Sequence, residues 1–328
     1  FDCSYNGVCK NSVCECFPQW KGPHCGSLNL IPGSKNAGLQ SIINGSRVTS
    51  WGGSIVKDDI TNKYHMIAAE MMDYCGMAVW LSNSQIVHAI SDTFDGEYIR
   101  QETVKGGELF SHEPSMVKAL DTGELVVYYT HIYPPATYKY PCTKCDNGLT
   151  HEQECPTTSN NDYGRNWDIP LPTKMIYTSN ISDNNAWSDV IDLDNITPDV
   201  YIDSNLVTYI FPNGSLIGII RNDNSNTSKA YNFIRATNWK DNTTYSYNEM
   251  LPYSGNIIRQ YGEDPFIWYD SRYDVIHSIW HYRPNGRNYP NGIHAFSTDN
   301  GHTFQAFLDF NIYPQEWAYT PFAEYTDG

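Results

Sequence analysis

A pattern of short apolar runs separated by turn residues recurs four times along the chain and limits the folds that it can adopt. The first copy starts at Ser50 with the runs 50–56, 64–70 and 85–91. Further copies start at Ser111, Asn205 and Glu263. Runs of this length are typical of strands rather than helices, and a strand–turn–strand unit repeated every roughly 45 to 90 residues predicts a β-propeller with four-stranded blades.

In a propeller the first strand of each blade lines the central channel, so the residues that begin these strands should converge. Any chemistry is therefore expected at the starts of the repeats, residues 51–54, 112–115, 205–208 and 263–265. A structural alternative stays open, because Pro114 and Pro265 are tolerated at a strand start, where their missing N–H groups cost little.

The charge balance argues against a nucleic-acid partner. The chain has 328 residues with 21 Lys and Arg against 37 Asp and Glu, for a formal charge of −16, whereas phosphate recognition needs clustered basic side chains. No run of 18 apolar residues is present, so the sequence predicts no membrane span. Aromatic residues make up 14% of the chain, which suits strands and also suits stacking on sugar rings.

Nine cysteines and six Asn-X-Ser/Thr sequons indicate an oxidising, glycosylating compartment, and we expect a secreted glycoprotein. The sequons are at Asn44, Asn180, Asn195, Asn213, Asn226 and Asn242. Asn195 is the weakest of them, because Pro198 follows its Thr197. The chain starts at Phe1 without a signal-like apolar segment, so we expect a processed chain or an excerpt of a longer precursor.

Residues 1–26 hold five cysteines, Cys3, Cys9, Cys14, Cys16 and Cys25, and end in Trp20-Lys21-Gly22-Pro23-His24-Cys25. This spacing resembles an EGF-like domain. The resemblance implies the pairs Cys3–Cys14 and Cys16–Cys25, and leaves Cys9 for a cysteine expected upstream of Phe1. A zinc site is the alternative use of the thiols, but no histidine has matching ligand spacing.

We interpret residues 27–50 as a connector and residues 51–328 as the propeller. A polar insertion at about 132–171 carries Cys142, Cys145 and Cys155. Together with Cys75 these should form two disulfides, whose connectivity the sequence leaves open. Residues 299–304 predict a hairpin turn at Asn300-Gly301. Four blades are clear, and a fifth is begun by residues 316–325.

Several segments of the propeller resemble the secreted eukaryotic proteins related to glycosyl hydrolase family 43, which are five-bladed propellers. They are 50–53, 69–71, 75–76, 83–89, 112–115, 263–268 and 294–301. The resemblance implies three carboxylates at the channel mouth: a general base Asp on the first blade, a pKa-tuning Asp on the second and a general acid Glu on the third. Here the corresponding positions are 52–54, Glu113 and Asn205, so the triad is not intact.

Glycoside hydrolysis needs two carboxylates roughly 5 to 9.5 Å apart. The candidates that should converge are Glu113, Glu263 and Asp264, with Glu70 in reserve. The candidate glycan-binding residues are Trp51, His88, His112 and His294. Each has a structural alternative, since a histidine near a strand start is often a buried polar residue with a protein partner.

Two functions therefore remain open. The first is a non-catalytic extracellular structural or glycan-binding subunit of a matrix or surface filament, whose partners are carbohydrate, copies of itself or other extracellular glycoproteins. The second is an active glycoside hydrolase similar to family 43, with Glu113 and either Glu263 or Asp264 as acid and base. We expect no cofactor and no metal site, because no Asp-x-Asp-x-Asp run marks a calcium loop. A structural calcium ion at the propeller centre stays open as an alternative.

Overall fold

The computed structural model describes most of the chain. The described residues are 3–30, 32–34, 36–40, 42–43, 46–72, 75–77, 80–131, 171–196, 205–224, 229–249, 251–252, 262–282 and 291–306. The expected insertion at about 132–171, apart from its last residue, and the expected fifth blade at 316–325 lie outside them, as do Asn44, Asn226, Cys142, Cys145 and Cys155. The described residues separate into two compact units, one of 1–32, 217–234 and 247–328, the other of 33–216 and 235–246.

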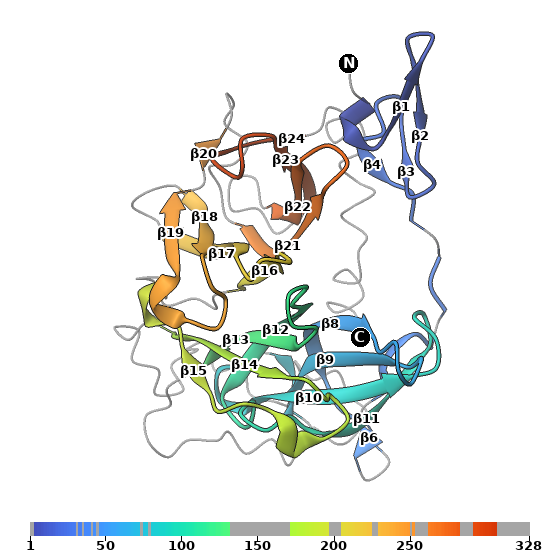
Figure 1. Cartoon of the computed structure of the whole chain (residues 1–328). Coiled ribbons are helices and arrows are strands. Elements are labelled where there is room, and N and C mark those ends of the chain that lie inside the picture. Colours follow the sequence, from blue (N-terminus) through green and yellow to red (C-terminus); the bar gives the residue numbers. More distant parts are fainter. Residues whose placement is uncertain are drawn as a thin grey trace. The chain divides into compact units, whose positions relative to one another are not determined.

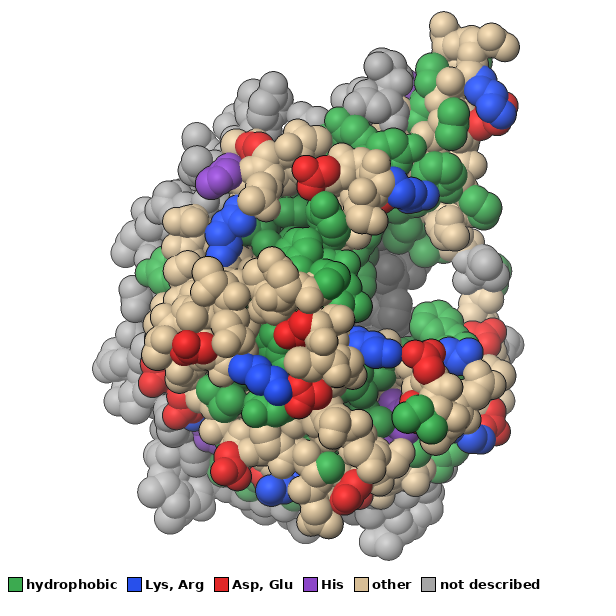
Figure 2. All heavy atoms as spheres, viewed as in Figure 1, with side chains coloured by type: hydrophobic (Ala, Val, Ile, Leu, Met, Phe, Trp, Pro, Cys, Tyr) green, Lys and Arg blue, Asp and Glu red, His purple; other side chains and the backbone are tan. Residues whose placement is uncertain are grey.

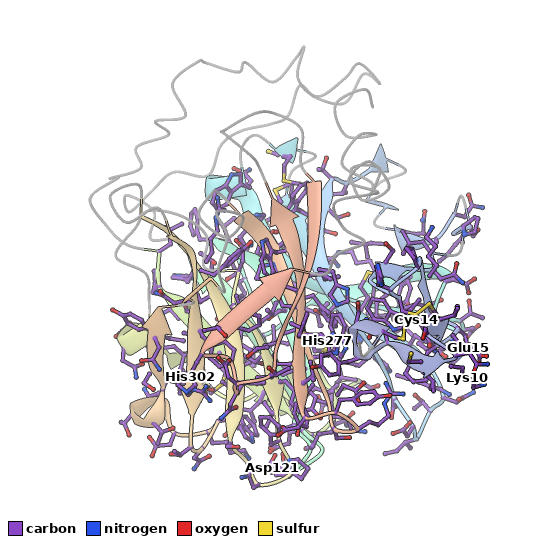
Figure 3. The ribbon with its side chains drawn as sticks, turned by 90° about the horizontal axis from the view of Figure 1, so that it is seen from above. Lys10, Cys14, Glu15, Asp121, His277 and His302 are labelled. Carbon is purple, nitrogen blue, oxygen red and sulfur yellow. A yellow bond between two sulfur atoms is a disulfide. The ribbon has the colours of Figure 1, made fainter. Side chains whose placement is uncertain are left out.

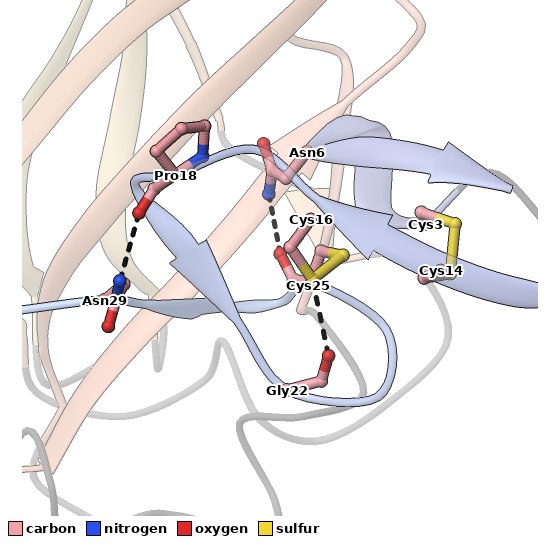
Figure 4. The surroundings of a disulfide bond; sticks show 8 residues. All are labelled: Cys3, Asn6, Cys14, Cys16, Pro18, Gly22, Cys25 and Asn29. Atoms are coloured by element: carbon pink, nitrogen blue, oxygen red, sulfur yellow. Dashed lines mark hydrogen bonds between the residues drawn. A yellow bond between two sulfur atoms is a disulfide. The ribbon is translucent and has the colours of Figure 1, made fainter.

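The N-terminal module is small and made of paired strands. Its strands are β1 (Gly7–Lys10), β2 (Val13–Cys16), β3 (Trp20–Lys21) and β4 (Ser27–Leu28), preceded by the 3-10 turn η1 (Cys3–Tyr5). β1 pairs with β2 and β3 with β4. Disulfides join Cys3 to Cys14 and Cys16 to Cys25, which confirms the predicted pairing (Figure 4).

Side-chain amides hold the loops of the module in place. Asn6 donates from Nδ2 to the carbonyl of Cys25 at 3.1 Å, and Asn29 donates to the carbonyl of Pro18 at 3.0 Å (Figure 4). A Cβ at Gly7 would lie 2.5 Å from the carbonyl of Glu15, so only glycine fits where β1 meets β2. The disulfides and these two bonds replace the apolar core that so short a segment lacks.

The rest of the described chain forms four antiparallel blade sheets, labelled in Figure 1. The first has the order β5-β11-β10-β9-β8, the second β12-β13-β14-β15, the third β16-β17-β18-β19 and the fourth β20-β24-β23-β22-β21. The predicted propeller of four-stranded blades is confirmed, with two differences. β5 adds to the first blade in parallel with β11, and β20 adds to the fourth in parallel with β24.

The strands of the first two blades are β5 (Gly38–Gln40), β8 (Ser50–Lys57), β9 (Tyr64–Met71), β10 (Ser84–Ser91), β11 (Glu97–Thr103), β12 (Ser111–Lys118), β13 (Leu125–His131), β14 (Thr173–Thr178) and β15 (Ile191–Asp192). Those of the last two are β16 (Val207–Ile210), β17 (Leu216–Asn224), β18 (Lys229–Ala236), β19 (Ser246–Glu249), β20 (Leu251–Pro252), β21 (Gly262–Asp270), β22 (Val275–Tyr282), β23 (Asn291–Ser297) and β24 (Thr303–Ala306). The other elements are β6 (Ile42–Ile43), β7 (Ser46–Arg47), α1 (Trp80–Asn83), η4 (Asn184–Ala186), η5 (Asp194–Ile196) and η6 (Asn242–Thr244).

In the unit that holds the first two blades, a core fills the space between their sheets. Ile67 and Ile86 of the first blade pack with Val127, Tyr129 and Ile176 of the second. These residues alternate along their strands with residues of the opposite face, as strands with two different faces require. Ser54 of β8 accepts at its Oγ from the backbone N of Met116 in β12 at 2.9 Å, so the first strands of the two blades are joined directly.

No helix in the described part of the chain is both long and apolar enough to cross a bilayer. Figure 2 shows acidic and basic side chains interspersed over the face in view rather than gathered into a basic patch.

The predicted turn at Asn300-Gly301 is confirmed and supports a test of the core. Gly301 has φ +81, and a Cβ there would lie 2.3 Å from the ring of the buried Phe233. Gly123 has a similar φ of +77 but nothing within 4 Å. We expect Gly123→Ala to cost about 1 kcal/mol of unfolding free energy through backbone strain alone, and Gly301→Ala about 3 kcal/mol or more. Equal losses in denaturant titrations of the two variants would contradict the predicted clash.

Candidate functional site

A residue in the left-handed backbone region lies within two residues of the start of the first strand of each blade. These residues are Gly52 (φ +56), Glu113 (φ +50), Asn205 (φ +41) and Asp264 (φ +50). In β8, β12 and β21 the strand register shifts at this point, which marks a bulge. Left-handed residues other than glycine carry strain and cluster at functional sites. The repeat starts singled out from the sequence therefore share one backbone geometry.

Glu113 and Trp51 meet at the start of the first two blades. Glu113 is 7% exposed, and its Oε1 accepts a hydrogen bond from the indole Nε1 of the half-buried Trp51. A Cβ built on Gly52 would lie 3.6 Å from the same Oε1. Position 52 thus faces the Glu113 carboxylate, but it carries no side chain.

His112 and Trp80 extend this cluster. The ring of Trp80, in α1, stacks on His112 with centroids 4.6 Å apart, and the Oγ of Ser84 lies 2.7 Å from His112 Nδ1. Trp51 and Trp80 both pack against Ala69 and the rest of one apolar cluster, which also includes Met71 and Cys75. We call Trp51, Gly52, Trp80, His112 and Glu113 the mouth cluster.

A disulfide secures the segment that carries Trp80. Cys75 is disulfide-bonded, as predicted, and its partner lies outside the described residues. Asn83 donates from Nδ2 to Cys75 Sγ at 3.0 Å and is fully buried. Sequence reasoning missed Trp80 and Ser84, although a tryptophan five residues after a cysteine of the propeller was a visible signal.

Glu70, the reserve carboxylate, belongs to a buried ion pair. It is 0% exposed and accepts from Arg100 Nε at 2.9 and 3.2 Å and from Gln85 Nε2 at 2.8 Å. Removing one partner of such a pair costs several kcal/mol, which indicates a structural role. Glu70 is therefore not available as an acid or base at the mouth cluster.

His88 lies on β10, two strands away from β8, and the structure does not bring it to the mouth cluster. It is 2% exposed, and its Nε2 lies 2.8 Å from Nδ1 of His65. Burial, reinforced by the neighbouring His65, lowers the pKa of His88 to about 4. Its partners are thus protein groups, and no contact of His88 favours its predicted glycan-binding role.

The remaining candidates lie in the fourth blade. Asp264 is half-buried in the bulge of β21, and Glu263 precedes it, paired with His281 across the sheet. The side chain of Glu263 lies outside the described part of the structure. His294 is 0% exposed in β23, and its Nδ1 lies 3.1 Å from the carbonyl of Gly26 in the N-terminal module. These two carboxylates and this histidine stay predictions as site residues.

Among the described residues, no group of three or more His, Cys, Asp or Glu side chains is arranged to hold a metal ion. The structure therefore gives no positive indication of the calcium ion that the sequence left open.

Comparisons with known proteins agree with both parts of the fold. Residues 1–27 match the family model of the teneurin-like EGF domain. A family 117 glycoside hydrolase of the marine bacterium Zobellia galactanivorans superposes with a TM-score of 0.50 at 10% identity, covering 79% of this chain and 69% of that one. The chain has the fold of a glycoside hydrolase β-propeller.

Two further solved structures superpose on the chain less completely or less closely. A xylan β-1,4-xylosidase of Bacillus halodurans gives a TM-score of 0.50 at 11% identity, over 77% of this chain and 42% of that one. A family 43 β-xylosidase/α-arabinofuranosidase from a compost microbial metagenome gives 0.48 at 12% identity, over 80% and 74%. No curated protein sequence matches the chain. At these identities the likeness concerns the fold alone.

A matched pair of variants can test whether a side chain at position 52 points toward the Glu113 carboxylate. We expect Gly52→Asp to be less stable than Gly52→Asn by about 1–2 kcal/mol at neutral pH, because only the aspartate places a second negative charge beside Glu113. Asn and Asp both tolerate a left-handed φ, so backbone strain cancels in the comparison. The difference should vanish as pH falls and the carboxylates protonate, below about pH 4. Melting temperatures that differ equally at pH 7 and pH 3.5 would contradict this geometry.

Proposed function

We propose that this chain is a secreted carbohydrate-binding protein that keeps the fold of a glycosidase without hydrolysing glycosides. The observation that carries the proposal is Gly52. The resemblance to family 43 assigns the general base to the first blade, and the position that faces Glu113 has no side chain there. Glu70, the other carboxylate close in sequence, is held by Arg100. Neither position 52 nor Glu70 therefore supplies the second carboxylate that hydrolysis needs beside Glu113.

The groups that remain suit binding. Glu113 offers carboxylate oxygens to sugar hydroxyls, which are hydrogen-bond donors, and bonds to a charged acceptor are the stronger kind. Trp51 and Trp80 are half-buried flat rings beside it, of the kind that stack on the apolar faces of pyranoses. Shared packing under both rings holds them in place, which reduces the entropy lost on binding.

The EGF-like module and its two disulfides support an extracellular location for this role. We extend the proposal to a subunit of a matrix or surface filament, with carbohydrate, copies of the same chain or other glycoproteins as partners. The second candidate function is hydrolysis of glycosides, with Glu113 as one of the two carboxylates. It is favoured by the left-handed φ of Glu113, which lies directly before Pro114.

Glycan binding is the first property to measure. An array of plant, algal and animal glycans identifies a ligand, and calorimetry then compares the native protein with Trp80→Ala and Glu113→Gln. We expect each substitution to weaken binding at least tenfold, because each removes a stacking surface or a charged acceptor. Phe94→Ala is the control, since this ring is 63% exposed and contacts Tyr64 at the other end of the first blade.

The same preparations test hydrolysis against aryl glycosides and the glycans that bind. We expect no product above a heated sample of the protein. Turnover that Glu113→Gln abolishes while binding persists would replace the proposal with the hydrolase. Absence of both binding and turnover would leave the structural subunit and overturn the proposed carbohydrate binding.

The sequons differ in whether their amide nitrogens are free to carry a glycan. Asn195 uses both hydrogens of Nδ2, toward the carbonyls of Asn242 at 3.0 Å and Tyr245 at 2.5 Å. Asn180 and Asn213 are exposed, and each accepts at Oδ1 from the backbone N of its own sequon serine. Neither Asn180 nor Asn213 donates a hydrogen bond from Nδ2 to a described residue.

We therefore expect glycans at Asn180 and Asn213 and none at Asn195 when the chain is secreted from a glycosylating host. Peptide mapping after enzymatic deglycosylation in heavy-oxygen water measures the occupancy of each site. Asn195→Gln should also cost about 1–2 kcal/mol of unfolding free energy through its lost hydrogen bonds, whereas Asn180→Gln should not. Folded protein with a glycan on Asn195 in most molecules would contradict this assignment.

A further inference from the structure

The EGF-like module packs on the fourth blade inside one compact unit. Trp20 of β3 stacks on His294 of β23, with centroids 4.6 Å apart and planes 16° apart. At the edge of this contact the guanidinium of Arg272 lies 4.6 Å from the ring centre of Phe17, a cation–π arrangement. Tyr5 meets Phe296 edge-on at 5.4 Å. The module is thus docked through aromatic rings.

A pair of histidines lies beneath Trp20. His294 Nδ1 lies 3.1 Å from the Gly26 carbonyl, and a carbonyl accepts only, so this nitrogen carries the proton. In the neutral ring Nε2 then accepts, and it lies 3.3 Å from Nδ1 of His277, which therefore donates. The bonds run in one direction, from His277 to His294 to the module. The His294 ring must be neutral for this chain of bonds to exist, because its Nε2 is the acceptor that a second proton would occupy.

The surroundings oppose a charge on either ring. Both histidines are 0% exposed, and burial lowers the pKa of His277 to about 4 and that of His294 well below its ordinary value. The carboxylate of Asp270 would favour a charged His277, but Arg272 holds it at 2.9 and 3.2 Å. On the module, the titratable groups next to Trp20 and Gly26 in sequence are Lys21 and His24.

The first blade contains the same arrangement without the module. Asp58 precedes His65 in the first blade by the same number of residues as Asp270 precedes His277 in the fourth. The ring contacts also correspond: His65 Nδ1 faces His88 Nε2, as His277 Nδ1 faces His294 Nε2. There His88 Nδ1 lies 3.5 Å from the Glu102 carboxylate, which can compensate a proton. In the fourth blade the corresponding nitrogen meets the Gly26 carbonyl instead (Figure 3 shows His277 and the module that carries Cys14).

We propose that the neutral pair His277–His294 latches the EGF-like module onto the fourth blade, and that acidification of the surroundings releases the module. A proton on His294 Nε2 would point at the Nδ1–H of His277, so in this tautomer of His277 the bond between them would be lost. Released, His294 loses the cover of Trp20 and Gly26 and can hold its charge in water. The trigger is a buried pair and the moving part is the module, as in other histidine switches.

The direction of the pH effect follows from the protons taken up. The pKa of His294 is lower in the docked form than in the released form, so the released form binds more protons. Docking is therefore fully favoured above about pH 6.5, and it weakens about tenfold per pH unit below that for each histidine protonated on release. If His277 also took up a proton on release, docking would weaken more steeply with falling pH.

The free thiol of Cys9 gives a direct readout. Cys9 is exposed on the hairpin of the module and is the free cysteine of the described residues. A maleimide dye on Cys9 of the full chain reports how the module tumbles through its fluorescence anisotropy. We expect high anisotropy at pH 8, and a reversible fall to the value of a tethered module between pH 6.5 and 4. Trp20→Ala should show the low value already at pH 8.

Matched double variants identify the histidines responsible. His277→Phe with His294→Phe keeps aromatic rings beneath Trp20 and removes the titrating groups, so the module should stay docked down to pH 4. His65→Phe with His88→Phe makes the same change in the first blade and should leave the transition unchanged. Far-ultraviolet circular dichroism at each pH confirms that the blades stay folded.

An anisotropy in the native chain that does not change from pH 8 to 4 would overturn the proposal. So would an unchanged transition in the His277/His294 variant, or its loss in the His65/His88 variant. None of these results depends on whether the mouth cluster binds a glycan, so the latch and the proposed function fail separately.

Discussion

A left-handed residue near the start of each first strand is the constraint that sets the geometry of the functional region. It shifts the register of β8, β12 and β21 and turns the residue that occupies it away from the ordinary strand alternation. In the second blade this aims Glu113 at the first blade, and the bond from Ser115 Oγ to the carbonyl of Leu206 anchors the same strand to the third. The strain at Glu113, of the order of 1–3 kcal/mol, persists because the neighbouring strands fix it on both sides.

The same constraint fixes what position 52 contributes to the mouth cluster. A left-handed backbone accepts glycine most readily, so Gly52 fits the strand without strain. Because Gly52 has no side chain, Glu113 lies beside Trp51, and the ring of the adjacent His112 stacks on Trp80. This combination of a carboxylate and flat rings is the basis of the carbohydrate binding proposed above.

The two histidine pairs show that neighbours, more than residue type, decide what a buried titratable group does. His65–His88 and His277–His294 have the same placement in their blades, and burial lowers the pKa of all four. The first pair has carboxylates near both ends, Asp58 and Glu102. The second is closed by a backbone carbonyl of a separate module, so its protonation state is coupled to the position of that module.

The β-propeller could be predicted from the sequence because strand length and turn residues are local signals, and the resemblance of residues 1–26 to an EGF-like domain implied the two disulfides that the structure confirms. The sequence also placed Trp51, His112 and Glu113 at one mouth, since repeat starts converge in any propeller. Three contacts emerged from the folded chain: Glu70 pairs with Arg100, His88 lies against His65, and Trp80 stacks on His112 in the mouth cluster. The folded chain also places His294 beneath the module. These depend on side-chain contacts between residues 15 to 268 positions apart, which no local pattern encodes.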